Sequence, residues 1–210
     1  MARYLTIHPD APQGRFIAQA AAVIRANGVI SIPTDSGYAL CCGLGDKGAV
    51  ERIRRIRDVD ERHHLTLMCR DLSEISQFAR VDNAQYRLLK ATTPGRYVFI
   101  LEGAGELPRR ILHPRRKTIG LRIPDHKVAL ALLEALGEPL LTSTLILPGD
   151  EEPLAEGWEI QERLRDQLDL ILGGGRCGSE PTTVVDLTSL PPKLVRKGCG
   201  SLDPFNFDEI

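Results

Sequence analysis

The sequence predicts an α/β fold, a single domain in which helices pack on a twisted mixed sheet. Its 210 residues suit one large domain. The apolar content of 42% and the charged content of 26% are ordinary for a globular protein. Helix-like and strand-like stretches interleave along the chain, and no repeat or linker divides it. We therefore expect one domain over residues 1–210, with its core at about residues 14–200.

The first half of the chain alternates between amphipathic and apolar segments. Apolar residues recur at helical spacing between residues 15 and 27, which predicts a helix there. Asp46 suits the N-cap of a second helix that ends near Arg57. The other predicted elements are strands over residues 29–33, 39–42 and 65–68 and helices over 71–78 and 83–91.

The second half is richer in apolar, β-branched runs. The predicted strands cover residues 97–101, 118–123, 139–147, 168–172, 182–187 and 193–196. A strongly apolar helix over residues 128–136 is expected to begin at a cap on Asp125 and to stop at Gly137. A further helix is predicted over 158–166, with loops over 109–117 and 148–157.

A site is predicted where the strand that begins at Val29 ends. Pro33 cannot donate to a sheet ladder, so we expect the strand to stop there. Thr34, Asp35 and Ser36 follow, and Gly37 makes the turn flexible. A rigid strand that delivers hydroxyl groups to a sheet edge is typical of a binding site. An ordinary exit from strand to loop has the same spacing, and the residues alone do not separate the two interpretations.

The charges nearly cancel but are unevenly distributed. The net charge is −1, yet basic residues gather at 52–62 and 109–117, and acidic residues gather at 150–162. A neutral total can therefore hide one basic face. Four arginines fall within six residues of the helix that ends at Arg57, where they repel one another unless an anion is near. A solvated helix face is the alternative interpretation.

Several classes of protein are not favoured. The five cysteines lack CxxC spacing and are interpreted as reduced thiols of a cytoplasmic protein. No apolar run approaches the ~18 residues of a membrane span. Residues 43–48 fit GxGxxG, but no acid follows at the position that a dinucleotide site needs, and there is no P-loop. His63 and His64 are interpreted as loop residues, and no metal site is expected.

Seven segments in order resemble the YrdC/YciO family, whose best-known members make threonylcarbamoyl-AMP. They are residues 32–38, 55–57, 65–68, 120–124, 139–144, 181–187 and 194–198. Residues 34–40 and 67–72 are most similar to the YciO branch. The resemblance implies a YrdC/YciO-like fold with a basic concave surface. It also implies a nucleotidyltransferase that joins L-threonine, bicarbonate and ATP, with Mg²⁺ entering with ATP, in the service of tRNA modification.

The resemblance also implies roles for particular residues. Thr34, Arg122 and Thr142 would bind L-threonine; Arg55, Thr144 and Arg196 would bind the nucleotide; Arg55 and Arg57 would be catalytic. We expect the strand ends at Thr34, Arg122 and Thr144 to converge on one cavity. Three of these assignments have a structural alternative. Arg122 could face the surface, the hydroxyls at 142–144 could bond to the main chain, and Arg196 could be an edge-strand surface charge.

Two departures from the synthases bear on activity. Arg55 stands where the family has lysine, and Ile146 stands where it has asparagine. The alternative function is therefore a non-catalytic protein that binds double-stranded RNA or tRNA through Arg52, Arg54, Arg115, Arg116 and Lys117. A nucleotide-binding enzyme with another substrate is a third hypothesis.

Overall fold

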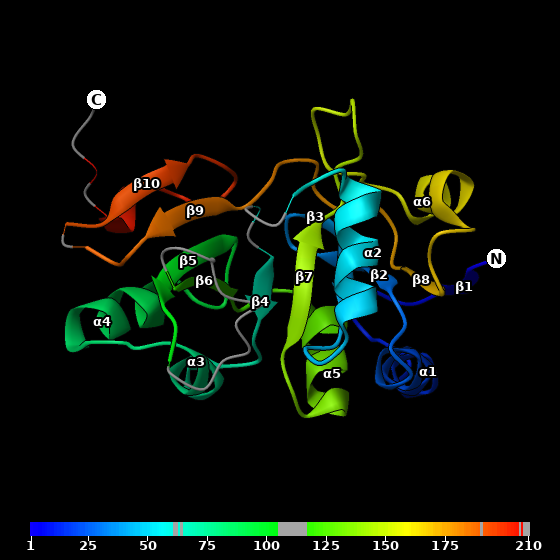
Figure 1. Cartoon of the computed structure of the whole chain (residues 1–210), viewed down its shortest axis with the longest axis horizontal. Coiled ribbons are helices and arrows are strands. Elements are labelled where there is room, and N and C mark those ends of the chain that lie inside the picture. Colours follow the sequence, from blue (N-terminus) through cyan, green and yellow to red (C-terminus); the bar gives the residue numbers. More distant parts are fainter. Residues whose placement is uncertain (61–62, 64, 105–116, 190, 206, 208–210) are drawn as a thin grey trace.

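Ten strands form one mixed sheet in a computed structural model that describes residues 1–60, 63, 65–104, 117–189, 191–205 and 207 (Figure 1). The strand order is β1-β8-β2-β3-β7-β4-β6-β5-β9-β10. The strands are β1 (Arg3–Thr6), β2 (Ile30–Thr34), β3 (Gly37–Cys42), β4 (Thr66–Met68), β5 (Tyr97–Glu102), β6 (Thr118–Arg122), β7 (Leu140–Thr144), β8 (Leu170–Gly173), β9 (Thr183–Asp186) and β10 (Lys193–Arg196). Parallel pairs join β1 to β8, β2 to β8, β4 to β6 and β5 to β9. The mixed sheet that the sequence predicts is therefore confirmed.

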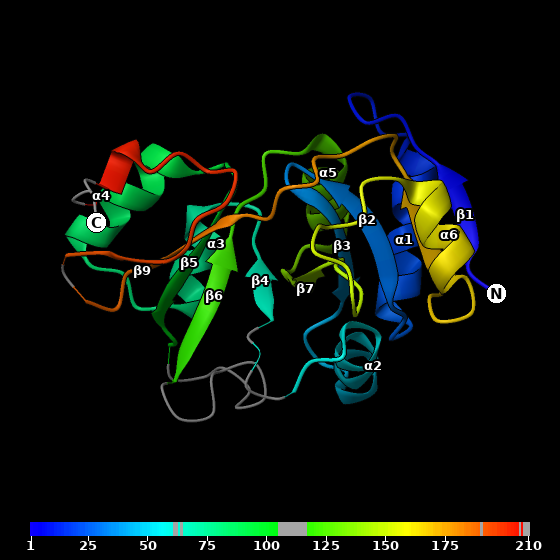
Figure 2. The same ribbon diagram turned by 90° about the horizontal axis from the view of Figure 1, so that it is seen from above.

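Helices pack on both faces of this sheet (Figure 2). They are α1 (Gly14–Arg25), α2 (Lys47–Arg57), α3 (Leu72–Phe78), α4 (Asn83–Thr92), α5 (Lys127–Leu136) and α6 (Gly157–Leu164), and a 3-10 turn, η1, covers Asp203–Phe205. α1 and α5 lie together on one face, whereas α2 lies on the opposite face, where it contacts β3 and stands beside β7 in Figure 1.

The alternation of side chains along β3 explains why there are two apolar cores. Leu40 and Cys42 join a core that includes Ile53 of α2, whereas Ala39 and Cys41 join the core under α1 and α5. Successive residues of a strand point to opposite faces, so one apolar strand supplies both layers. This accounts for the unbroken apolar runs that the sequence shows in its central strands.

Helix boundaries agree closely with the predicted ones, with one correction at α5. Asp46 caps α2 as predicted, since its Oδ1 accepts the Ala49 N–H at 2.6 Å. Asp125 does not cap α5; the N-cap is His126, and the Asp125 N–H is donated instead to Asp35 Oδ2 at 3.0 Å. Gly137 ends α5 in the left-handed conformation, with φ 73°, as predicted.

β2 continues through Pro33 to Thr34, one residue beyond the predicted end. Pro33 lies opposite Tyr38 of β3. The Tyr38 N–H bonds to the Leu154 oxygen, and its own oxygen accepts the Leu145 N–H, so this pair exchanges no ladder bonds. On its other side β2 pairs with β8 only through Ile30 and Ser31. The missing proline N–H therefore costs the sheet nothing at this position.

The segment 174–182 crosses the sheet from β8 to β9 and links its two halves (Figure 1). The Tyr38 side chain is fully buried beneath it. The Tyr38 hydroxyl donates to the Gly175 oxygen at 2.9 Å and accepts the Gly174 N–H at 3.0 Å. The first part of this crossing is therefore anchored to β3 by one phenol group.

Within the described residues, no helix has both the length and the apolar character that spanning a membrane requires. The apolar residues of the central strands are instead buried in the two cores of the sheet.

We predict that Tyr38→Phe lowers the free energy of unfolding by about 1–3 kcal/mol, because it leaves the buried Gly174 N–H without its acceptor. Urea unfolding measures the change. Tyr86→Phe is the matched control, since Tyr86 is 44% exposed and should change stability by only a few tenths of a kcal/mol. Equal effects of the two substitutions would contradict the anchoring role of Tyr38.

Candidate functional site

A cavity of about 270 Å³ lies over one face of the central strands. Its floor is a row of small or β-branched side chains contributed by six neighbouring strands. In order from β3 to β9 the cross-strand pairs are Ala39–Thr144, Thr142–Thr66, Thr66–Gly120, Gly120–Ile100 and Val98–Val184. Because these side chains are short at the centre of the row, the sheet face is hollow there.

The ionisable side chains that line this cavity, among the described residues, are all basic: Arg57, His63, Arg122 and Arg196. They come from the end of α2, the segment before β4, the end of β6 and the edge strand β10. The predicted basic concave surface is therefore present. Such a cavity favours a ligand that carries negative charge.

Arg57 is fixed at the end of α2 by the backbone that follows β7. Its Nη1 donates to the Thr144 oxygen and, at 2.7 Å, to the Ile146 oxygen. Its Nε is buried and has no hydrogen-bond partner among the described residues. Burial, with the nearby charge of Arg196 as the smaller cause, lowers the pKa of Arg57 to about 10. A held guanidinium with an unused donor suits an anion.

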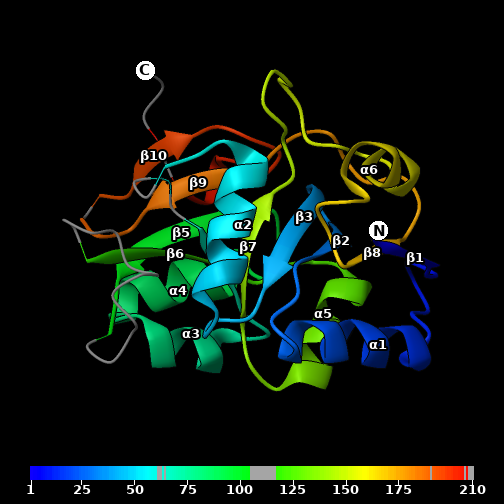
Figure 3. The same cartoon turned by 45° about the vertical axis from the view of Figure 1, so that its right-hand side comes forward.

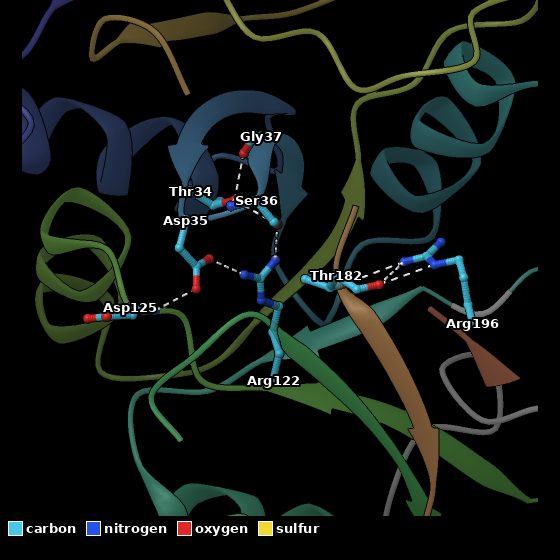
Figure 4. Close-up of polar contacts among 8 residues, drawn as sticks. All are labelled: Thr34, Asp35, Ser36, Gly37, Arg122, Asp125, Thr182 and Arg196. Atoms are coloured by element: carbon cyan, nitrogen blue, oxygen red, sulfur yellow. Dashed lines mark hydrogen bonds and ion pairs between the residues drawn. The ribbon is translucent and has the colours of Figure 1, made fainter. Parts of the chain in front are cut away.

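Arg196 of the edge strand also lines the cavity, close enough to Arg57 for the two charges to interact, and Figure 4 shows its side chain beside Thr182. Its Nη2 donates to the Thr182 oxygen at 2.8 Å and to Thr182 Oγ1 at 3.2 Å. Partial burial lowers the pKa of Arg196 below its ordinary value. The edge-strand position that the sequence allowed is correct, and the side chain nevertheless lines the cavity. Two like charges held here repel each other, and a bound anion would relieve that repulsion.

His63 is a lining residue that the sequence interpretation assigned only to a loop. Partial desolvation at the cavity wall, followed by the charges of Arg57 and Arg196, lowers the pKa of His63 below its ordinary value. The imidazole is therefore mostly neutral near pH 7. The residues around His63 show no metal-ligand spacing, so the sequence gives no sign that His63 lines a cavity.

Arg122 forms a buried ion pair that the sequence analysis missed (Figure 4). Its Nη2 contacts Asp35 Oδ1, and each of the two side chains is only 4% exposed. Asp35 Oδ2 accepts the Asp125 N–H, so both carboxylate oxygens are used. Ser36 Oγ lies 3.4 Å from Arg122 Nη1, and Arg122 Nε has no partner among the described residues. A charged group is costly to bury without a partner, so an arginine in an apolar strand could have predicted a carboxylate such as Asp35 beside it.

Thr34 shapes this end of the cavity without being one of the described residues that line it. Its Oγ1 donates to the Gly37 oxygen and accepts the Ser36 N–H at 3.3 Å. Ser36 in turn contacts Arg122. Arg122 and Thr144 both line the cavity, as expected, whereas neither Thr34 nor Ser36 is among the described residues that line it.

The hydroxyl groups after Leu141 also line the cavity. Thr142, Ser143 and Thr144 all belong to its wall, and so does Ile146. Thr142 Oγ1 donates to the Thr66 oxygen at 3.0 Å. The hydroxyl of Thr142 therefore bonds to the main chain, as the alternative interpretation had it, while remaining at the cavity wall.

Arg55 is separated from Arg57 by the geometry of α2. It is exposed and is not among the described residues that line the cavity. Residues two apart on a helix do not share a face, so the helix that aims Arg57 inward aims Arg55 outward. This arrangement therefore does not support the prediction that Arg55 and Arg57 act together at the nucleotide.

Two of the predicted RNA-binding arginines on α2 are engaged in ion pairs. Arg52 pairs with Asp169 at 2.9 Å, and Arg54 pairs with Glu51 at 2.7 Å. Lys117 is exposed, whereas Arg115 and Arg116 lie outside the described residues. Residues 43–48, which fit GxGxxG, follow β3, and that strand is antiparallel to both neighbours, so they do not open a βαβ unit.

The fold and the cavity thus define a class: an α/β protein with a basic, hydroxyl-lined cavity on a mixed sheet. A family model described as telomere recombination, covering the Sua5, YciO and YrdC proteins, matches residues 22–198. The chain belongs to this family.

Particular relatives support the assignment. The chain is 54% identical over 205 residues to the uncharacterized protein YciO of Escherichia coli K12, covering 98% of this chain and 100% of that protein. The crystal structure of E. coli YciO superimposes with a TM-score of 0.95 at the same identity and the same coverage. A threonylcarbamoyl-AMP synthase of Mus musculus is 30% identical over 189 residues, which are 86% of this chain and 66% of that protein.

A more distant structure shares the fold. The crystal structure of P. abyssi Sua5 complexed with L-threonine has a TM-score of 0.86 at 24% identity, covering 94% of this chain and 58% of that chain. The predicted family resemblance and the YciO-like fold are both confirmed.

We predict that Asp35→Ala lowers the free energy of unfolding by about 3–5 kcal/mol, because it leaves the Arg122 charge buried without a partner. Chemical denaturation measures the loss. Replacing both partners, as in Asp35→Leu with Arg122→Met, should cost less than the single change. Asp150→Ala is the control, since its pair with Arg163 is partly exposed and is worth only about 0–1 kcal/mol. A loss no greater than the control's would show that the buried pair is not essential.

Proposed function

We propose that this chain is a threonylcarbamoyl-AMP synthase-like nucleotidyltransferase that joins L-threonine, bicarbonate and ATP. The observation that carries the proposal is the cavity itself. It places two guanidiniums at one end and a third at the other, with hydroxyl groups between them. Such a cavity suits a polyphosphate at one end and a carboxylate at the other.

The end formed by Arg122 and Thr142 would take the amino acid. A guanidinium is the natural partner of the threonine carboxylate, and Arg122 Nε is not used by any described residue. The relative from P. abyssi has a structure complexed with L-threonine, which supports L-threonine as the amino-acid ligand. Thr34 would act indirectly, by fixing the turn that holds Ser36.

The end formed by Arg57, Thr144 and Arg196 would take the phosphates of ATP. The two arginines are already held by backbone oxygens, so little order would be lost on binding. None of the described lining residues is a carboxylate, so Mg²⁺ would enter on the phosphate oxygens, and it would neutralise charge there. Arg55 lies outside this group and could meet only a part of the ligand that extends from the cavity.

The reaction needs positioning more than covalent chemistry. The threonine ammonium group first gives up a proton, and the free amine then condenses with bicarbonate to a carbamate, with loss of water. A carbamate oxygen then attacks the α-phosphorus, and the bond to pyrophosphate breaks. Fixed cations next to the phosphates stabilise the charge that develops, so no nucleophilic side chain is required. The product would serve threonylcarbamoylation of tRNA in the cytoplasm.

A second candidate is a non-catalytic protein that binds double-stranded RNA or tRNA. Exposed Arg55 and Lys117 favour it, and the isoleucine at 146 in the cavity favours it as well. RNA affinity that falls steeply with salt, in a protein that makes no threonylcarbamoyl-AMP, would identify this function.

The deciding experiment is ATP–pyrophosphate exchange with and without L-threonine and bicarbonate. We predict exchange that requires both. Arg196→Ala should lower it by roughly tenfold to a hundredfold, because one hydrogen bond to a charged group is worth about 1.5–3 kcal/mol. Arg52→Ala is the control, because its pair with Asp169 does not belong to the cavity wall. A folded wild type with no exchange would rule out the synthase function.

Ile146→Asn should raise the rate if the chain is a weakened synthase. The asparagine adds a donor and an acceptor at the cavity wall, worth roughly tenfold to a hundredfold in rate. It should also cost about 1–3 kcal/mol of stability where the amide is unpartnered. Arg55→Lys should change little, because Arg55 is exposed outside the cavity. Bicarbonate-dependent pyrophosphate release measures both variants, and a folded Ile146→Asn variant with no gain contradicts the prediction.

A further inference from the structure

The Asp35–Arg122 pair closes the amino-acid end of the cavity. Both side chains are 4% exposed, and Arg122 lines the cavity, whereas Asp35 lies behind it (Figure 4). The pair is neutral as a whole, so the charge of Arg122 is already matched inside the protein. A ligand carboxylate therefore meets an arginine that has a partner.

Separating this pair without replacement is costly. If a simple carboxylate took Arg122 away from Asp35, the Asp35 carboxylate would remain buried and unpaired. Its Oδ2 would keep the Asp125 N–H, but its Oδ1 would lose the only charged donor it has among the described residues. Simple carboxylates should therefore bind poorly at this end.

An α-amino acid avoids that cost because it brings both charges. Its carboxylate can take the place of Asp35 on Arg122, and its ammonium group can take the place of Arg122 on Asp35 Oδ1. Each buried charge then keeps a partner of opposite sign, and Oδ2 stays bonded to the Asp125 N–H, which holds Asp35 in place. The one charge-assisted hydrogen bond between Arg122 and Asp35 is thereby replaced by two, one to each charged end of the ligand.

We propose that Asp35 is a specificity-determining residue that binds the ammonium group of a zwitterionic α-amino acid, through an exchange of partners with Arg122. The inference rests on the proposed function and deepens it, because it states which chemical feature selects the substrate. It explains why a carboxylate, rather than a neutral acceptor, follows Thr34 in a turn otherwise built of hydroxyls and glycine. An amide at position 35 would put an NH2 donor in place of one carboxylate oxygen, so either Arg122 Nη2 or the Asp125 N–H would face a donor instead of an acceptor.

The experiment compares two ligands on two proteins by isothermal titration calorimetry. The ligands are L-threonine and 3-hydroxybutyrate, which is threonine without its amino group. Wild type should bind L-threonine roughly tenfold to a hundredfold more tightly, the value of one charge-assisted hydrogen bond. In Asp35→Asn this preference should fall to within about threefold, because threonine loses a partner and the simple carboxylate no longer strands a buried charge.

Controls separate this role from a structural one. Asp166→Asn removes an acid on the exposed surface, so it should keep the wild-type preference. If Asp35→Asn fails to fold, wild type is tested with threoninol, which has the amine without the carboxylate, and L-threonine should exceed both analogues. Wild type that binds 3-hydroxybutyrate as well as threonine, or an Asp35→Asn protein that keeps the preference, overturns the inference. Wild type that binds no L-threonine overturns it together with the proposed function, whereas intact threonine-dependent exchange with no ligand preference overturns the inference alone.

Discussion

The buried ion pair between Asp35 and Arg122 is the interaction on which the site depends. The two residues lie at the ends of β2 and β6, which are not neighbours in the sheet, so the pair fixes the turn after β2 against the end of β6. Gly37 completes that turn with φ 125°, and a Cβ there would lie 2.9 Å from Pro153 Cβ. The turn is therefore held by charge on one side and by close packing on the other.

The hollow beneath this turn follows from the sizes of side chains on one sheet face. Thr66, Gly120 and Thr142 lie opposite one another at its centre, where larger residues would fill the space. Figure 3 shows α2 standing over β7 at this part of the sheet, where its last residue, Arg57, is held by backbone oxygens. The cavity thus combines a floor of short side chains, where the Thr142 hydroxyl is satisfied by the main chain, with cations that are held by backbone oxygens. An anionic ligand would complete it.

Much of the fold could be predicted from the sequence because its signals are local. Helical stripes, the Asp46 cap and the glycine after α5 each depend on a few neighbouring residues, and they were placed to within one or two positions. β1 was not predicted, because four residues of mixed polarity acquire their structure only by pairing with β8. The predicted strand ended at Pro33, one residue too early, for a similar reason: which of its backbone groups must form hydrogen bonds depends on the neighbouring strands.

The candidate site was predicted unevenly for the same physical reason. Arg122, Thr144 and Arg196 interrupt apolar strands, which is a signal that the sequence carries by itself. Asp35 and His63 owe their places to residues far along the chain, and no local pattern shows that Arg122 or Arg57 will lie beside them. Arg55 was grouped with Arg57 because the two are close in sequence, whereas the helix turns them to different sides.

The central claim is that one cavity takes an amino acid at Arg122 and a polyphosphate at Arg57 and Arg196. A crystal structure of the wild-type protein with L-threonine and ATP tests it most directly. The account predicts phosphate oxygens within hydrogen-bond distance of Arg57 and Arg196, and a threonine carboxylate on Arg122 with its ammonium group on Asp35. Ligands bound outside the cavity, or a threonine that contacts neither Arg122 nor Asp35, would contradict it.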